Sequence, residues 1–177
     1  MAKHEHDQHD AHVHLGHDTA ENGREYLKFT GVIAGIVLVT IFLAWARGFE
    51  VHRFMGDFMA VFFIVFATFK FVNLEMFSVT YQSYDIIAKR FPLWGYAFPF
   101  IEGVLGVAYL LFDQNNTLNI ITMLITGTAA IGVFQELRNK SNIMCACLGN
   151  VIKLPLSKVS FIEDAAMFLM AAAMIIV

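Results

Sequence analysis

Five stretches of about twenty mostly apolar residues follow one another along this chain and constrain its fold more than any other feature. A helix of that length crosses the hydrocarbon core of a bilayer, which is about 30 Å thick. The stretches cover residues 27–46, 54–77, 93–112, 118–137 and 159–177. The fifth is short and opens near two acids, so the sequence predicts an all-α, polytopic membrane helical bundle of four to five transmembrane helices.

The composition excludes several other classes of protein. The chain is 58% hydrophobic and 15% charged, whereas soluble domains average about 45–50% apolar and about 25% charged residues. Eighteen Phe and only three Pro suit long helices better than alternating barrel strands. A net charge of −3 argues against a nucleic-acid partner and leaves the lipid bilayer as the expected surroundings. The sequence has no nucleotide loop, Ser–His–Asp set or HExxH motif, so we expect neither a hydrolase nor an ATPase.

The first 25 residues differ from everything that follows. They are polar and acidic, so we expect a disordered, His-rich N-terminal tail at 1–25 and the helical bundle at 26–177. They also lack the early apolar core of a secretory signal. Six of the seven histidines lie in this tail: His4, His6, His9, His12, His14 and His17. Imidazole binds zinc and copper, so the tail is a candidate metal-capturing segment, with a solubilising or expression-derived tail as the alternative.

The basic residues predict an orientation in the membrane. With five spans, nine basic residues fall on the N-terminal side and two, Arg47 and Arg53, on the other, while Lys70 lies within a span. Cytoplasmic loops carry an excess of Lys and Arg. We therefore expect a multi-pass protein of the cell (inner) membrane whose N-terminus and cysteine loop face the cytoplasm.

Cys145 and Cys147 lie one residue apart in the loop before the last apolar stretch. Two thiols this close can ligate a soft metal, cycle between dithiol and disulfide, or serve as inert small hydrophobes. Lys140 and Lys153 lie in the same loop, and nearby cations favour the thiolate. The pair is therefore a candidate catalytic pair and also a candidate metal ligand.

Lys70 and Glu102 are ionisable residues at membrane depth. Charged residues there are costly and are functional candidates by default. Lys70 lies about seven residues and Glu102 about ten residues from the cytoplasmic face, on oppositely directed helices, so an ion pair between them is sterically reasonable. The alternatives are a snorkelling Lys70 with a protonated Glu102, or a substrate, proton or metal site.

Two smaller features carry structural expectations. Glu163 and Asp164 should open the last helix, exposed to solvent, where acids complement the helix dipole. Gly31-x-x-x-Gly35 should allow two helices to approach closely.

Taken in order, the polar motifs resemble those of a known family. The pattern consists of a span with Lys70, a loop with Tyr81 and Tyr84, a span with Pro99-x-x-Glu102, and a loop with Cys145-x-Cys147-x-Gly149. Over residues 27–177 it resembles the MauE/DoxX-like redox-associated membrane proteins, the family of the methylamine-utilisation protein MauE. The histidine tail is outside the resemblance.

The resemblance implies a bundle of at least four membrane helices, similar to that of quinone-linked disulfide carriers. It also implies thiol redox at Cys145 and Cys147 in the maturation of a partner protein. In methylamine metabolism that partner is the disulfide-rich subunit of methylamine dehydrogenase. A quinone and a thioredoxin-like protein are the expected cofactor and partner for this role.

Two other functions stay open from the residues themselves. The chain can handle a heavy metal, copper or zinc, through its histidine tail and cysteine pair, with a metal-carrying partner protein. It can also be a non-catalytic subunit of a membrane assembly.

Overall fold

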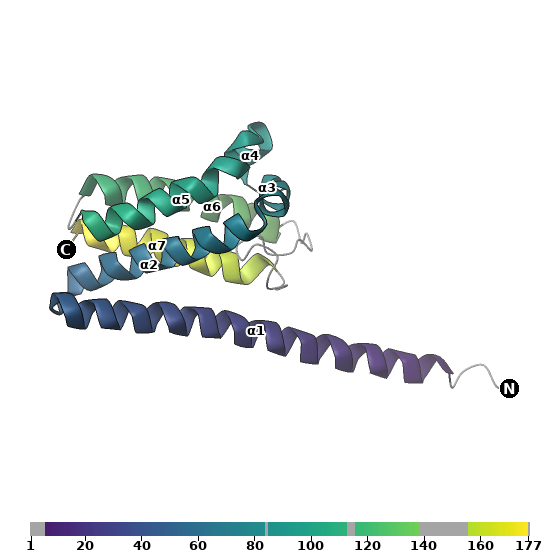
Figure 1. Ribbon diagram of the computed structural model, residues 1–177. Coiled ribbons are helices and arrows are strands. Elements are labelled where there is room, and N and C mark those ends of the chain that lie inside the picture. The colour runs from purple at the N-terminus through teal and green to yellow at the C-terminus, as the bar shows by residue number, and fades with distance from the viewer. Residues whose placement is uncertain (1–5, 84, 113–115, 139–155, 177) are drawn as a thin grey trace.

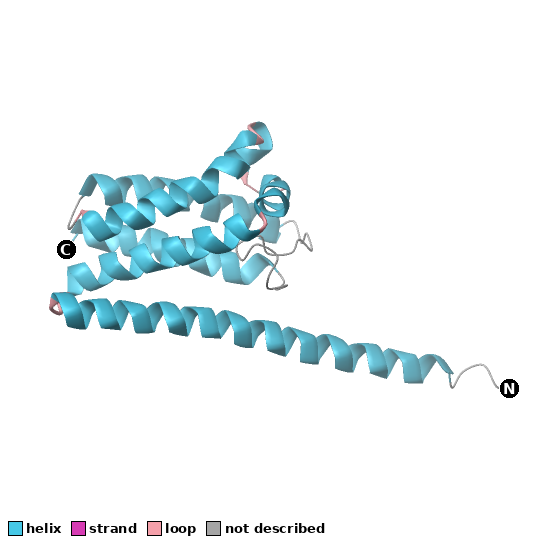
Figure 2. Cartoon of the chain, in the orientation of Figure 1, coloured by secondary structure: helices cyan, strands magenta, loops and turns pink. Residues whose placement is uncertain are grey.

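The computed structural model describes the backbone of residues 6–83, 85–112, 116–138 and 156–176, and side chains from Leu27 onward except those of 136–137 and 156–161. In this part of the chain all regular structure is helical (Figure 2). The helices are α1 (His6–Arg47), α2 (Val51–Val72), α3 (Leu74–Gln82), α4 (Ile86–Arg90), α5 (Leu93–Leu111), α6 (Asn116–Arg138) and α7 (Leu156–Ile176). The predicted all-α class is confirmed.

Four segments are long and apolar enough to cross a membrane. They are Leu27–Arg47, Val51–Val72, Leu93–Leu111 and Asn116–Gln135. These segments confirm the predicted multi-pass membrane protein. The fifth apolar stretch forms α7, which packs against α6: a Cβ added at Gly127 would lie 3.2 Å from the Phe168 ring. That α7 crosses the membrane stays a prediction.

The long helices alternate in direction (Figure 1). At one end of the bundle α2 ends, α5 begins, α6 ends and α7 begins, and the short helices α3 and α4 lie there; we call this the α3–α4 end. At the other end α1 passes into α2 through a turn with Gly48 at φ +86°, a backbone conformation that favours glycine. We call this the Gly48 end.

Helix α1 stands apart from the other long helices. It begins at His6 and so includes most of the segment for which the sequence predicts a disordered tail. Its N-terminal part projects beyond the α3–α4 end of the bundle (Figure 1). Among the described helices it packs mainly against α2, and its last residue, Arg47, also donates to the Leu110 carbonyl oxygen of α5 at 3.2 Å. Gly31 and Gly35 have open space around them, so the expected close helix approach at this pair does not occur within the described chain.

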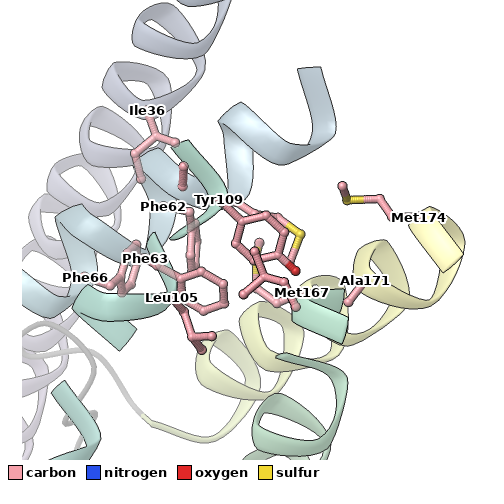
Figure 3. Close-up of a cluster of buried hydrophobic side chains, with 12 residues drawn as sticks. Ile36, Phe62, Phe63, Phe66, Leu105, Tyr109, Met167, Ala171 and Met174 are labelled. Atoms are coloured by element: carbon pink, nitrogen blue, oxygen red, sulfur yellow. The ribbon is translucent and has the colours of Figure 1, made fainter. Parts of the chain in front are cut away.

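The core lies among α2, α5 and α7 and is rich in aromatic rings (Figure 3). Phe62 and Phe66 of α2 stack with ring centroids 4.3 Å apart, and Phe63 stacks on Tyr109 of α5 at 6.3 Å. Helix α7 contributes Met167, Ala171 and Met174 to the same cluster. Because these side chains fill the space between three helices, they fix the relative positions of α2 and α5.

Small residues bring α2 and α5 into close contact. A Cβ at Gly106 would lie 3.0 Å from the Ala60 carbonyl oxygen and 3.1 Å from the Ile64 nitrogen. These are backbone atoms, so the two helices could not stay this close with a larger residue at 106. Toward the α3–α4 end, this contact brings Lys70 and Glu102 to facing positions.

Candidate functional site

The ion pair predicted between Lys70 of α2 and Glu102 of α5 is present in the structure. The Lys70 Nζ lies 2.5 Å from both Glu102 Oε1 and Oε2. The two side chains are only 5% and 8% exposed. Charge-assisted contacts of this kind are among the strongest hydrogen bonds in proteins. The bundle therefore holds two opposite charges in its interior.

Aromatic rings enclose the ammonium group of Lys70. Its Nζ lies 5.3 Å from the ring centroid of Phe77 and 4.9 Å from that of Phe98. The Tyr81 ring lies 5.1 Å from Phe77 and 4.6 Å from Phe98. A cation within about 6 Å of a ring face is attracted by its quadrupole. Two rings and one carboxylate thus replace the water that normally surrounds a lysine, and Tyr81 packs behind both rings.

A second hydrogen bond closes the α3–α4 end over this site. The Tyr81 hydroxyl donates to Asp85 Oδ2 at 3.1 Å. The other oxygen, Asp85 Oδ1, accepts from the backbone nitrogens of Ile87 at 2.9 Å and Ala88 at 2.7 Å and so caps α4. Asp85 is 1% exposed. One buried carboxylate therefore links the tyrosine beside the ion pair to the start of α4.

Burial and neighbouring charges set the protonation of these two groups. Burial raises the pKa of Tyr81 well above its ordinary value, and the carboxylates of Asp85, Asp164 and Glu102 raise it further. Tyr81 therefore stays a neutral hydrogen-bond donor. Burial also raises the pKa of Asp85, against the lowering effect of the hydrogen bonds it accepts.

Two local sequence features turn α3 back onto α5. Asn73 leaves the helical conformation, and its side chain accepts a bond from the Met76 nitrogen at 3.3 Å, so α2 ends and α3 begins there. A Cβ at Gly95 of α5 would lie 2.7 Å from the Ser78 Oγ and 3.1 Å from the Ser78 carbonyl oxygen. Glycine at 95 therefore lets α3 lie directly on α5.

Within α5, Phe98 and Glu102 are four residues apart and share one face of the helix. Pro99, which lies between them, carries no backbone N–H and removes one helical hydrogen bond at this level. Phe98, directly before the P-x-x-E motif, and Glu102, the last residue of the motif, thus form an aromatic and an acidic wall of the site.

The cysteine pair lies outside the described residues. Cys145 and Cys147 belong to the segment between α6, which ends at Arg138, and α7, which begins at Leu156. Both of these helix termini lie at the α3–α4 end of the bundle (Figure 1). The roles assigned to the two thiols stay predictions.

The predicted histidine ligands are described only in part. His4 lies outside the described residues, and His6, His9, His12, His14 and His17 are placed by the backbone of α1 alone. Among the side chains that the structure describes, no three from His, Cys, Asp and Glu gather to hold a metal ion.

The expected capping role of Glu163 and Asp164 is wrong. Helix α7 begins at Leu156, and its first turn has no acidic residue. Glu163 is 9% exposed and therefore lies inside the bundle, and Asp164 is half-buried. The helix starts before the apolar stretch does, so both acids fall in its interior turns rather than at its N-terminus.

Sequence reasoning missed several polar contacts, and two of them had a signal in the sequence. Asp57 of α2 is buried and forms an ion pair with Arg47 at 2.7 Å. Its signal in the sequence was an acid inside an apolar stretch, which indicates a buried partner. The sequence signal for the Tyr81–Asp85 hydrogen bond was the i, i+4 spacing of the two residues. Its signal was weak, because a Tyr and an Asp at that spacing occur in many exposed loops.

Comparison with known protein families finds a match to "Methylamine utilisation protein MauE" over residues 49–177. No curated protein and no solved structure matches the chain significantly. The matched region includes α2 to α7 and therefore both Lys70 and Glu102, whereas α1 lies before it.

Proposed function

Because the chain belongs to the MauE family of multi-pass membrane proteins, we propose that it is a membrane thiol-redox factor that matures a partner protein. The observation that carries this proposal is the buried Lys70–Glu102 pair. Lys70 lies in the last turn of α2, and α2 ends at the end of the bundle where α6 also ends and α7 begins (Figure 1). Cys145 and Cys147 lie between those two helices in the sequence. The proposed reaction centre therefore combines the two thiols with the buried polar site.

The proposed chemistry is thiol–disulfide exchange. The thiolate of one cysteine attacks a disulfide sulfur of the partner, and a mixed disulfide forms as the other partner sulfur leaves as a thiolate. The second cysteine then attacks the mixed disulfide, which releases the partner as a dithiol and leaves Cys145 and Cys147 joined. In the reverse direction the pair gives its disulfide to the partner. Each disulfide formed matches one that is reduced, so the exchange needs no third reactant.

The buried pair supplies the proton chemistry in this proposal. A thiol must lose its proton before it can attack, and a nearby cation stabilises the resulting thiolate. Glu102 accepts that proton, and Lys70, released from its carboxylate partner, attracts the thiolate. The Tyr81–Asp85 bond controls access to the pair from the α3–α4 end.

A redox titration of the purified full-length protein tests this function. The pair should form one disulfide that opens and closes reversibly in a glutathione buffer, as read by the mass added on thiol alkylation. Glu102→Gln should slow disulfide exchange and change its pH dependence, because the proton acceptor is lost. Glu75→Gln, an exposed acid on α3, is the matched control and should behave as the unmodified protein. A pair that never forms a disulfide under any buffer poise rules out the proposal.

Heavy-metal handling is a second candidate, supported by the course of α1. Five of the tail histidines belong to the N-terminal part of α1, and this part of the helix projects beyond the α3–α4 end of the bundle (Figure 1). A metal captured there would be released on the side where α6 ends and α7 begins. Deletion of residues 1–25 should then lower the copper or zinc bound per chain, as measured by elemental analysis. Unchanged metal content after this deletion argues against the second candidate.

A further inference from the structure

The segment that connects α2 to α5 lies at a membrane surface. The spans on either side of it, Val51–Val72 and Leu93–Leu111, meet it at the α3–α4 end, so the segment begins and ends at the same level of the bilayer. Helix α3 does not continue the line of α2 (Figure 1). It turns onto α5 instead, where Ser78 lies against Gly95. We call residues 73–92 the interfacial segment, because they lie along the end of the bundle at this level.

The four charged residues of the interfacial segment are sorted between its inner and outer faces. Asp85 is buried, where it accepts from the Tyr81 hydroxyl and caps α4. Lys89 and Arg90, in the last turn of α4, are both exposed. The remaining charge, Glu75, is exposed in the first turn of α3. The outer face of α4 therefore presents two adjacent cations, while the acid nearest to them in sequence faces inward.

Exposed apolar side chains flank these two cations. Phe91 is 64% exposed and Leu93 is 77% exposed, and Ile86 is exposed at the start of α4. Single exposed apolar residues are common on proteins and need no explanation. Three of them beside two cations, at the level where a span begins, match the boundary between lipid headgroups and acyl chains. Trp94 lies four residues after Arg90 at the same level, where tryptophan is enriched in membrane proteins.

We propose that Lys89 and Arg90 bind the phosphate of an anionic phospholipid, while Phe91 and Leu93 insert beside its acyl chains. Ammonium and guanidinium groups are the usual protein ligands of a phosphate. A zwitterionic lipid carries the same phosphate together with a cationic choline, which two adjacent cations would repel. The preferred lipid should therefore carry a net negative charge, as phosphatidylglycerol does. Because the site lies on the outer face of α4, it does not depend on the proposed thiol chemistry inside the bundle.

The two tryptophans of the chain allow a local test, because brominated acyl chains quench tryptophan fluorescence only at short range. In the full-length Trp45→Phe protein, Trp94 is the one remaining reporter. This protein is reconstituted in phosphatidylcholine vesicles that contain brominated phosphatidylglycerol or brominated phosphatidylcholine at equal mole fraction. The brominated phosphatidylglycerol should quench Trp94 more strongly. Arg90→Gln should lower the relative affinity for phosphatidylglycerol about fivefold, and Lys89→Gln in addition should remove the preference.

The other tryptophan supplies a control for the position of the site. In the Trp94→Phe protein the reporter is Trp45, which is 82% exposed near the Gly48 end. Arg47, the nearest cation in sequence, pairs with Asp57 at 2.7 Å. Quenching of Trp45 should therefore be the same with both brominated lipids.

Lys28→Gln is the matched charge control for Arg90→Gln. Lys28 is exposed near the start of the span Leu27–Arg47, so this change removes one cation from a different helix. It should leave the lipid preference reported by Trp94 unchanged. Equal quenching of Trp94 by both lipids, or equal effects of Lys28→Gln and Arg90→Gln, refutes the site. The two cations of α4 then only complement its helix dipole, and the redox proposal is unaffected because both thiols are unchanged throughout.

Discussion

Lys70 and Glu102 stabilise each other only as a pair, because each would be an isolated charge in the bundle interior without its partner. Removing one partner of a buried ion pair costs about 3–5 kcal/mol, whereas replacing both with apolar residues is often neutral. We therefore expect Lys70→Met and Glu102→Leu each to lower the free energy of unfolding by about this much. The double variant should be close to the unmodified protein. Denaturant titration in mixed micelles measures all three.

The double variant also separates structure from function. It should fold but lack normal thiol-disulfide exchange, because the proposed proton acceptor and cation are both gone. A double variant that is stable and exchanges disulfides at the normal rate would show that the pair is structural only.

Asp85 gives the α3–α4 end a pH dependence whose sign follows from its raised pKa. The folded state favours the protonated carboxyl of Asp85. Its contribution to the free energy of unfolding is therefore complete below the unfolded-state pKa of about 3.9 and is lost as pH rises through the higher folded-state pKa. Asp85→Asn should remove this slope and still cap α4, because asparagine is also a good N-cap. The measurement is stability against pH, with Glu75→Gln as the exposed control. Equal slopes for Asp85→Asn and the unmodified protein would contradict the prediction.

At the scale of the helices, the close contact between α2 and α5 depends more on Gly106 than on Gly103, one turn earlier on α5. Gly106→Ala puts a Cβ against the backbone of Ala60 and Ile64, which cannot move aside, so we expect a loss of about 1–3 kcal/mol. At Gly103 the nearest atom to an added Cβ is the Ala67 Cβ at 3.8 Å, an ordinary contact. Gly103→Ala should therefore be neutral or stabilise by up to about 1 kcal/mol through helix propensity. Thermal unfolding of both variants makes the comparison.

The presence of the long helices was predictable from the sequence, whereas the residues at which they end were less predictable. Apolar length located the spans, because a membrane helix must cover the hydrocarbon core with its own residues. The second stretch was predicted to run on to Phe77, but Asn73 divides it into α2 and α3, since its side chain caps the following helix. A polar residue such as Asn73 can also lie within an unbroken helix, so the sequence alone does not show that a helix ends there.

In the candidate site, too, one part was predictable from the sequence and another was not. Depth along two oppositely directed helices was enough to pair Lys70 with Glu102, because the membrane fixes the axial position of each span. The aromatic enclosure and the Asp85 bond depend on how α3 folds back over α5, which Gly95 permits. Such a return has no periodic signal in the sequence, since it rests on contacts between residues far apart in the chain.

At the scale of the whole molecule, the distribution of basic residues predicts which way the bundle lies in the membrane. The α3–α4 end would carry nine basic residues on its side and the Gly48 end only two, Arg47 and Arg53. The positive-inside rule then predicts the α3–α4 end in the cytoplasm. One of those two residues, Arg47, is also engaged by Asp57 at 2.7 Å and by the Leu110 carbonyl at 3.2 Å. Its charge is partly neutralised within the fold, which strengthens the predicted asymmetry.

Reporter fusions test this arrangement and the role of α7 together. Alkaline phosphatase, which is active only outside the cytoplasm, should be active when fused after Phe49 or after Val177 and inactive after Arg138. Activity after Arg138 and none after Phe49 would mean that the bundle lies the other way round. Activity after Phe49 with none after Val177 would mean that α7 packs along α6 without crossing. In that case the two ends of the chain lie on one side of the membrane.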